Sequence, residues 1–251
     1  EISQNTLVIM VDVHRPSISL YPKILEEANK IAVIDHHRRG EEFVDSPVYS
    51  YVEPSASSAS ELVIELIRYN EKKIAISDRD ATILLAGILV DTNHFRNKTG
   101  SRTFDASVFL KDAGADNLLA DSFLKEEFEE HALKVKIMAN AVTPFLGVVV
   151  CKAAEEDIID RTMLAIVANE ILQIKGINAC FVVGRTEPKK VSVSARSDGT
   201  INVQYLMEKM SGGGHFAAAG TQLENKTIDE TYKNVMDVLD YYLNESRIEG
   251  Q

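Results

Sequence analysis

The sequence has few cysteines, few basic residues relative to acidic ones, and no long hydrophobic segment. No apolar run reaches the roughly 18–20 residues that span a bilayer, so we expect no membrane contact from this chain. Its two cysteines, Cys151 and Cys180, lie in apolar segments and match neither a zinc-binding spacing nor a disulfide framework. We therefore expect two reduced core thiols and a cytoplasmic setting.

Basic side chains are outnumbered, with 27 Lys and Arg against 38 Asp and Glu, which gives a net charge of −11 at pH 7. Such an acidic chain is poorly suited to binding long DNA or RNA through a broad basic surface. A small anionic ligand is compatible with this charge if its site supplies positive groups. The start, Glu1 to Gln4, has neither an initiator Met nor the features of a signal peptide, so we expect a piece of a longer protein.

The remaining composition is that of a folded protein, with 45% apolar and 26% charged residues among 251. In the first half, short apolar runs alternate with helical patterns, which favours an α/β fold with a parallel sheet. The runs are continuous rather than alternating, which predicts strands buried on both faces. The predicted strands span residues 6–11, 31–34 and 48–52. The predicted helices span residues 22–30, 58–67 (opened by a capping box over 58–61), 78–90, 105–113 and 120–140.

The second half predicts a further α/β domain. Its predicted strands span residues 146–151, 179–184 and 191–195, the last two as an antiparallel pair. Its predicted helices span residues 162–173, 203–210 and 229–243. We divide the chain into a parallel-sheet domain over 1–125, a helical connector over 126–142, and a smaller α/β domain over 143–251.

Polar residues follow the predicted strands of the first half directly. Asp12 follows the first strand, and Asp35-His36-His37 follow the second. Asp91 closes an apolar helix that can deliver it to the same place. Because the carboxyl ends of parallel strands line the ligand crevice, these groups predict a site of oxygen and nitrogen ligands, suited to Mn²⁺, Mg²⁺ or Fe²⁺. An aspartate after a strand also serves as a helix cap or turn residue, which is the alternative for each one alone.

The second half carries a candidate anion site. The glycine run over residues 212–214 lets backbone N–H groups approach an anion closely, and His215 can add a hydrogen bond. Arg196 leaves the end of a strand and is suited to bidentate contact with a phosphate. The alternative for the glycine run is a flexible turn.

These motifs together resemble a known family. The segment Val33-Ile-Asp-His-His-Arg-Arg-Gly40 resembles the signature of the DHH phosphoesterases. Two later segments, Ser192-Val-Ser-Ala-Arg196 and Gly212-Gly-Gly-His215, resemble the companion DHHA1 domain. Residues 11–16, 36–43 and 51–61 resemble the GdpP-type cyclic-di-AMP phosphodiesterases of Gram-positive bacteria. The order and spacing of the motifs match over nearly the whole chain.

The resemblance implies a two-metal site that activates water, with two Mn²⁺ ions or with Mg²⁺, Co²⁺ or Fe²⁺ in their place. Asp12 would bridge the metals, and His36 and Asp91 would complete the second one. Asp35 and His37 would be catalytic groups that fix the ligands or face the substrate. The family's first motif, His-x-x-x-Asp-x-Asp, does not occur in these residues, and we expect it to precede them in the longer protein.

The resemblance also implies which residues bind substrate. The implied substrate-binding residues are Ser194, Arg196, Gly212, Gly213, Gly214, His215 and Arg102. Arg102 could instead cap the helix that follows it. His14 and Arg15, which neighbour Asp12, are further candidates for substrate contact.

The implied reaction is hydrolysis of cyclic-di-AMP to linear pApA, with a cyclic or linear dinucleotide as the partner. A short-oligonucleotide exonuclease of the same superfamily and a catalytically silent cyclic-dinucleotide receptor are the alternatives. A pyrophosphatase of the family fits less well, because its second domain lacks Gly-Gly-Gly-His. The resemblance further implies a homodimer, and a full-length protein anchored in the cell membrane with this region on the cytoplasmic side.

Overall fold

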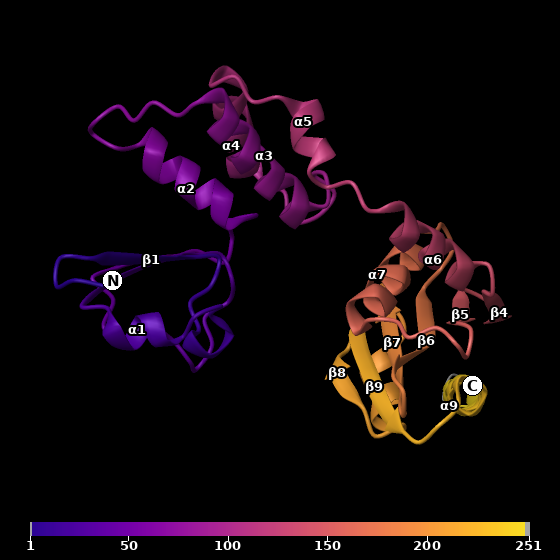
Figure 1. Cartoon of the computed structure of the whole chain (residues 1–251). Helices are drawn as coiled ribbons and strands as arrows, with labels where there is room; N and C mark the ends of the chain where they lie inside the picture. Colours follow the sequence, from indigo (N-terminus) through magenta and orange to yellow (C-terminus); the bar gives the residue numbers. More distant parts are fainter. Residues whose placement is uncertain (1, 249–251) are drawn as a thin grey trace. The chain divides into compact units, whose positions relative to one another are not determined.

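The computed structural model describes residues 2–248, with side chains described through residue 242. The chain divides into two compact units, Glu1–Lys125 and Glu126–Gln251 (Figure 1). Each unit has a sheet with helices, which confirms the predicted α/β class. The separate connector over 126–142 stays a prediction. Among the described residues, no helix combines the length and apolar character needed to cross a membrane.

The first unit is built on a parallel sheet of three strands in the order β1-β2-β3. The strands are β1 (Leu7–Val11), β2 (Lys30–Asp35) and β3 (Tyr49–Val52). Val11 lies opposite Ile34, and Asp35 lies opposite Val52. The three strands therefore end at one edge of the sheet, as the parallel arrangement requires.

The prediction that β1 is buried on both faces is wrong. Leu7, Ile9 and Val11 are 48%, 55% and 46% exposed, whereas Met10 on the opposite face is buried. β1 is an outer strand of this sheet, and helix α2 (Ala59–Arg68) packs against β2 instead. β3 is the other outer strand, and its Tyr49 is 46% exposed, so the prediction is wrong there as well. A continuous apolar run therefore indicated a strand correctly but did not indicate which strands are the outer ones.

Three helices of the first unit, those that follow Ser58, Ser77 and Asp116, begin at a polar side-chain cap supplied by these residues. The elements are a 3₁₀ turn (Pro16–Ile18), α1 (Lys23–Glu27), α2, α3 (Asp78–Thr92), α4 (Ser101–Asp112) and α5 (Asn117–Ser122). At α2 the Ser58 hydroxyl accepts from the Glu61 N–H, but the Glu61 carboxylate accepts from Ser57 rather than closing the predicted capping box. α1 is shorter than predicted because β2 already begins at Lys30.

The predicted helix over 120–140 is also wrong, because the chain breaks it into α5 and α6 (Phe128–Met138). Leu124, in the break, packs against the core of the first unit, whereas Ile137 of α6 is buried in the core of the second. The break thus lies where the chain leaves one core for the other, which helical periodicity does not record.

The second unit has a mixed sheet of six strands in the order β4-β5-β6-β7-β9-β8. The strands are β4 (Val142–Phe145), β5 (Val148–Lys152), β6 (Ala179–Glu187), β7 (Lys190–Ser197), β8 (Gly213–His215) and β9 (Ala218–Glu224); the helices are α7 (Arg161–Leu172), α8 (Val203–Glu208) and α9 (Ile228–Ile248). β5 and β6 are parallel, and the other pairs are antiparallel. The pair β6–β7 confirms the predicted hairpin.

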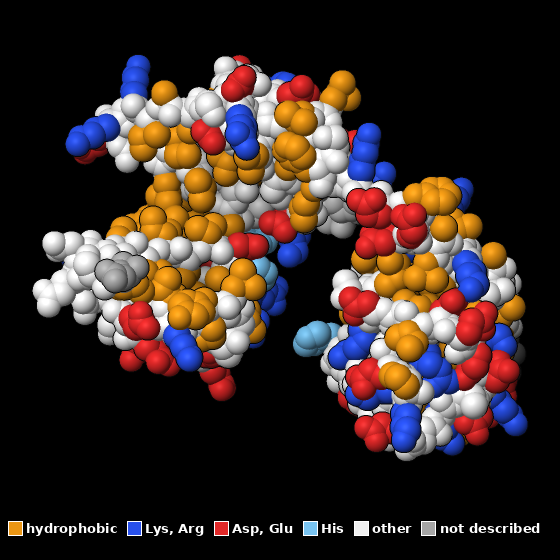
Figure 2. All heavy atoms as spheres, in the orientation of Figure 1, with side chains coloured by type: hydrophobic (Ala, Val, Ile, Leu, Met, Phe, Trp, Pro, Cys, Tyr) orange, Lys and Arg blue, Asp and Glu red, His pale blue; other side chains and the backbone are white. Residues whose placement is uncertain are grey.

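Two glycine-containing segments differ from their predictions. The strand expected over 146–151 is β5, which begins only at Val148 because Gly147 turns the chain before it with φ at 75°; the preceding strand β4 was not predicted. The run Gly212–His215 is mostly strand β8, which pairs with β9. On the face of the second unit seen in Figure 2, acidic and basic side chains are interspersed, unlike the continuous basic surface that binds long nucleic acids.

Candidate metal centre and ligand cavity

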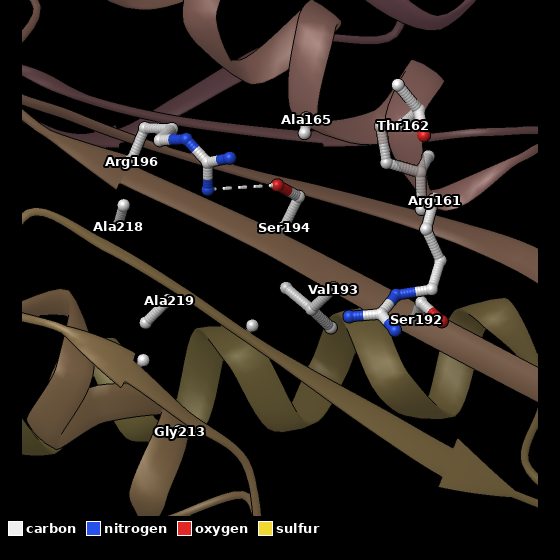
Figure 3. Close-up of a pocket in the computed structure, with 13 residues that line it drawn as sticks. Arg161, Thr162, Ala165, Ser192, Val193, Ser194, Arg196, Gly213, Ala218 and Ala219 are labelled. Carbon is white, nitrogen blue, oxygen red and sulfur yellow. Dashed lines mark hydrogen bonds between the residues drawn. The ribbon is translucent and has the colours of Figure 1, made fainter. Parts of the chain in front are cut away.

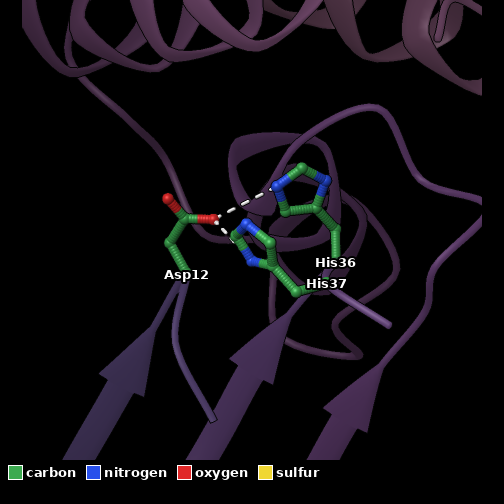
Figure 4. A group of neighbouring side chains, drawn as sticks. All are labelled: Asp12, His36 and His37. Atoms are coloured by element: carbon green, nitrogen blue, oxygen red, sulfur yellow. Dashed lines mark ion pairs between the residues drawn. The ribbon is translucent and has the colours of Figure 1, made fainter. Parts of the chain in front are cut away.

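Polar side chains gather at the carboxyl ends of β1 and β2. Asp12 directly follows β1, and its backbone N–H donates to the Ile34 carbonyl at 2.9 Å. His36 and His37 directly follow β2, whose last residue is Asp35. Because β1 and β2 are parallel neighbours, these residues emerge at the same edge of the sheet (Figure 4).

The side chains of Asp12, His36 and Asp91 meet at one point. His36 Nε2 lies 3.2 Å from Asp12 Oδ1 and 3.6 Å from Asp91 Oδ2. Asp91 reaches this point from the penultimate position of α3. His37 Nδ1 lies 3.7 Å from the same Asp12 oxygen, and one ligand atom from each of Asp12, His36 and His37 lies within 4.8 Å of the others.

The protonation of His36 follows from its neighbours. Its Nδ1 lies 3.4 Å from the Ala56 carbonyl oxygen, which only accepts, so Nδ1 carries the hydrogen. Nε2 then presents its lone pair to the Asp12 and Asp91 carboxylates. The lone pair and the two carboxylates repel one another. Either a proton on Nε2 or a bound cation removes this repulsion, and one divalent cation can bind His36, Asp12 and Asp91 together. The donor set therefore fits a metal ion, with the other His36 nitrogen fixed by a carbonyl as metal-bound imidazoles usually are.

The charges around Asp91 lead to the same conclusion. Burial raises the pKa of Asp91, and the nearby Asp12 carboxylate raises it further, although His36 opposes this. Two carboxylates held close together in a partly buried place repel each other. A divalent cation compensates this repulsion. Oxygen and nitrogen donors without a thiolate suit hard or intermediate ions.

Asp35 is a fully buried carboxylate that holds two imidazoles. Its Oδ1 accepts from the His37 backbone N–H at 3.1 Å and lies 2.7 Å from His37 Nδ1, and its Oδ2 lies 2.5 Å from His14 Nδ1. Burial acts to raise the pKa of Asp35, but the hydrogen bonds from His37 and His14 outweigh it, so the pKa is lowered. The ionised carboxylate fixes His37 through Nδ1 and leaves its Nε2 free of that contact.

His14 is placed differently from the expected substrate contact. It is 1% exposed and packs beside Phe43, with 5.4 Å between ring centroids. Its Nε2 has no hydrogen-bond partner among the described residues. His14 therefore orients Asp35 from within the fold, and no sequence pattern separates this role from that of the exposed Arg15 next to it.

A cavity of about 630 Å³ adjoins the two histidines within the first unit. Its lining includes His36, His37 and two basic residues that the sequence analysis missed, Arg38 and Lys98. The Lys98 charge also acts to lower the pKa of Asp91, one of the candidate metal ligands. Arg38 directly follows the histidine pair and was open to notice, whereas Lys98 reaches the cavity only through the fold.

Arg102 is engaged by groups of the first unit. Its Nε and Nη2 donate to the two Glu65 carboxylate oxygens, both at 2.8 Å, and Nη1 lies 3.2 Å from Ser55 Oγ. Tyr51 OH donates to Glu65 at 2.6 Å, and burial together with this contact raises the pKa of Tyr51 to about 12. These bonds tie α4 to α2, so substrate binding by Arg102 stays a prediction. Arg102 lies within α4 rather than at the cap position, which is Gly100.

The second unit has its own cavity, of about 560 Å³ (Figure 3). Four of the predicted substrate-binding residues line it: Ser194, Arg196, Gly213 and Gly214. Gly212 and His215 are not part of its lining. Arg161, at the start of α7, lines it as well and was missed by the sequence analysis.

The floor of this cavity is made by rows of residues across β7, β9 and β8. Residues opposite each other in antiparallel strands project from the same face of the sheet. The rows are Arg196–Ala218–His215, Ser194–Gly220–Gly213 and Ser192–Gln222, and all of these residues except the end residues His215 and Gln222 line the cavity. His215 therefore shares a row with Arg196, and the middle row consists of small residues.

The Arg196 guanidinium is held at one end of this floor. Its Nε donates to Asn169 Oδ1 at 3.0 Å, and its Nη1 donates to the Ala195 carbonyl at 2.9 Å. Burial lowers the pKa of Arg196. Among the described residues, no carboxylate lies within 4.0 Å of it. A partly buried cation without a counter-ion is suited to receive an anionic ligand.

Comparisons with known proteins agree with both halves of this structure. The model of the DHH family N-terminal domain matches residues 2–88, and the DHHA1 domain model matches residues 127–245. The cyclic-di-AMP phosphodiesterase GdpP of Geobacillus thermodenitrificans is 42% identical over 242 residues. The cyclic-di-AMP phosphodiesterase PdeA of Listeria monocytogenes is 40% identical over 241 residues. Each alignment covers 96% of this chain and 37% of the relative, so the chain spans about 37% of the length of these relatives.

A solved structure agrees on the fold. The crystal structure of an exopolyphosphatase-related protein from Bacteroides fragilis superposes with a TM-score of 0.73 at 23% identity, over 94% of this chain and 71% of that one. The two family models together cover most of the chain, and they occur in the order that the motifs predicted. The chain therefore belongs to the DHH family and joins that family's N-terminal domain to a DHHA1 domain.

Proposed function

We propose that this chain is the hydrolytic region of a metal-dependent phosphodiesterase that converts cyclic-di-AMP to linear pApA. The observation that carries the proposal is the convergence of His36 Nε2 on the carboxylates of Asp12 and Asp91, at 3.2 and 3.6 Å. The names of relatives at 42% and 40% identity support the choice of substrate. Mn²⁺ is the proposed ion, two per site, with part of the ligand set of the first ion supplied from outside these residues.

Asp12, His36 and Asp91 would hold the metal, which when bound polarises phosphate oxygens and lowers the pKa of water. The remaining work falls to the chain's own groups. Asp35 keeps His37 in one orientation, with a 55% exposed imidazole beside Asp12. From there, His37 in its protonated form can donate a hydrogen bond from Nε2 to the phosphodiester, or transfer that proton to the departing ribose oxygen and become neutral. Arg38 and Lys98 place positive charge in the adjoining cavity, where an anionic substrate gains most from it.

The second unit would bind the nucleotide. Arg196 supplies a guanidinium without an acidic partner among the described residues, and Ser194 lies 3.4 Å from its Nη1. His215 extends the Arg196 row, and Gly213 keeps the floor low for a flat ligand. We also propose that the longer protein is a homodimer, anchored in the membrane with this region in the cytoplasm.

The test is turnover of cyclic-di-AMP by the purified full-length protein that contains these residues, followed chromatographically as pApA release. Activity should disappear on removal of metal by EDTA and return with Mn²⁺; parallel additions of Mg²⁺, Co²⁺ and Fe²⁺ identify the preferred ion. His36→Ala should abolish turnover because it removes a metal ligand. The matched control is His131→Ala, which alters an exposed imidazole paired with Glu126 in the second unit.

The outcomes separate the alternatives. Retained turnover in His36→Ala removes the metal assignment. Tight binding of cyclic-di-AMP without turnover favours a receptor. Faster cleavage of a trinucleotide RNA than of cyclic-di-AMP favours the exonuclease, which would use the same metal ligands.

A further inference from the structure

The cavity of the second unit has a second guanidinium at the end opposite Arg196. Arg161, the first residue of α7, lines this cavity together with Ser192 and Ser194 (Figure 3). Its side chain points over β7 near Ser192, whereas Arg196 lies by Ser194. Ser192 and Arg196 are four residues apart along β7, which separates their backbones by roughly 13 Å.

Gln222 fixes the position of Arg161. With its amide oriented by its partners, the Gln222 side-chain oxygen accepts from Arg161 Nε and Nη1, each at 3.0 Å. Gln222 lies opposite Ser192 in the β7–β9 pair, so the contact holds the guanidinium above the last row of the floor. Within the described part of the chain, no hydrogen bond engages Arg161 Nη2.

The charge of Arg161 is as uncompensated as that of Arg196. Among the described side chains, no carboxylate lies within 4.0 Å of either guanidinium, although the protein carries 38 acidic residues. Arg185 of the same sheet, by contrast, pairs with Glu155. Between the two arginines, the floor is Ser194, Gly220 and Gly213, whose small side chains leave room for a ligand that reaches both ends.

We propose that Arg161, held by Gln222, is a specificity-determining residue that makes this cavity select dinucleotides over mononucleotides. Arg196 engages one acceptor group of the ligand, and Arg161 engages a second acceptor group of the same molecule. A mononucleotide satisfies Arg196 and leaves Arg161 solvated. The inference rests on the proposed function, because it assigns the nucleotide to this cavity.

The experiment measures binding of AMP and of linear pApA by calorimetry, with EDTA present so that no hydrolysis occurs. Arg161→Met removes the guanidinium and keeps much of the side-chain length. Loss of a charge-assisted hydrogen bond is worth about 1.5–3 kcal/mol, so pApA affinity should fall about 10- to 150-fold while AMP affinity stays unchanged. Arg161→Lys should bind pApA more tightly than Arg161→Met but less tightly than the wild type, because lysine keeps the positive charge but lacks the paired N–H donors of the guanidinium. Lys175→Met is the matched control, since it removes the same charge from an exposed position outside the cavity.

The results divide cleanly. Equal weakening of AMP and pApA in Arg161→Met, or no change in either, overturns the inference. A fall confined to pApA, absent in Lys175→Met, supports it. Failure of the proposed function itself gives a different result. In that case the unmodified protein neither binds pApA nor hydrolyses cyclic-di-AMP, so the result does not depend on residue 161.

Discussion

Two glycines of strand β8 should respond in opposite ways to the same added methyl group. A Cβ at Gly213 meets nothing within 4 Å, whereas a Cβ at Gly214 comes within 2.5 Å of both the Ala218 carbonyl oxygen and Ala219 Cα. Gly214 also has φ at 146°, a backbone conformation that residues with a side chain rarely adopt. Gly213→Ala should therefore spare the fold, and Gly214→Ala should strain it.

The magnitudes follow from these contacts. Overpacking against backbone costs about 1–3 kcal/mol and unfavourable backbone geometry another 1–3 kcal/mol, so Gly214→Ala should lose about 2–6 kcal/mol of unfolding free energy. Gly213→Ala should change it by less than about 1 kcal/mol, because a tolerated Gly→Ala change mainly restricts the unfolded chain. The Gly213 methyl shares the face of Ser194 and Gly220, where it meets a ligand lying on the floor. A clash of about 1–3 kcal/mol weakens pApA binding about 5- to 150-fold.

Urea unfolding and metal-free pApA titration test both halves of this prediction. Gly40→Ala is the control, since its Cβ also meets nothing within 4 Å but lies in the first unit. Wild-type pApA affinity in Gly213→Ala would show that no ligand approaches this floor. A Gly214→Ala variant as stable as the wild type would show that the β8–β9 contact yields more easily than its distances indicate.

Two further changes test the first unit. His14→Phe should alter the unfolding free energy little, because loss of the bond to Asp35 (about 1.5–3 kcal/mol) is offset by removal of the unpartnered Nε2 (about 1–3 kcal/mol). Turnover should nevertheless fall about 10- to 100-fold, because Asp35 loses one of the two imidazoles that position it. Unchanged turnover in a folded variant contradicts the positioning role of His14. Glu65→Gln should destabilise the protein at neutral pH and progressively less in acid. Hydrogen bonds from Arg102 lower the pKa of Glu65 below 4.5, so the stabilisation that the ionised Glu65 contributes is complete above pH 4.5 and is lost as the pH falls through the lowered pKa. Urea unfolding midpoints of both proteins at pH 7 and in acid check this prediction.

The parts of the structure that follow from local patterns were predictable. Apolar runs located β1, β2 and β3, and the polar residues after them located Asp12, His36 and His37 at a common edge. Strand ends of a parallel sheet converge whatever their loops do, so sequence order alone sufficed. The interruption between α5 and α6 was not predictable, because it depends on which core each apolar side chain joins.

The residues that escaped prediction depend on long-range register. Arg161 meets Gln222 only because β7 pairs with β9 and α7 lies over that face. His14 differs from Arg15 only by the direction in which one residue after β1 points. Neither the Arg161–Gln222 contact nor the direction of His14 can be predicted from residue spacing or composition, because each depends on contacts between segments far apart in the chain.

The position of Asp91 at the end of α3 has an electrostatic consequence of its own. Three successive left-handed residues, Asn93, His94 and Phe95, with φ of 47°, 55° and 62°, stop the helix immediately after Thr92. The aligned peptide dipoles of its 15 residues therefore terminate beside Asp91, where they leave about half an elementary negative charge. The backbone dipoles of α3 thus add an attraction for a cation near the Asp12 and Asp91 carboxylates. This attraction would persist even if Asp91 were neutral.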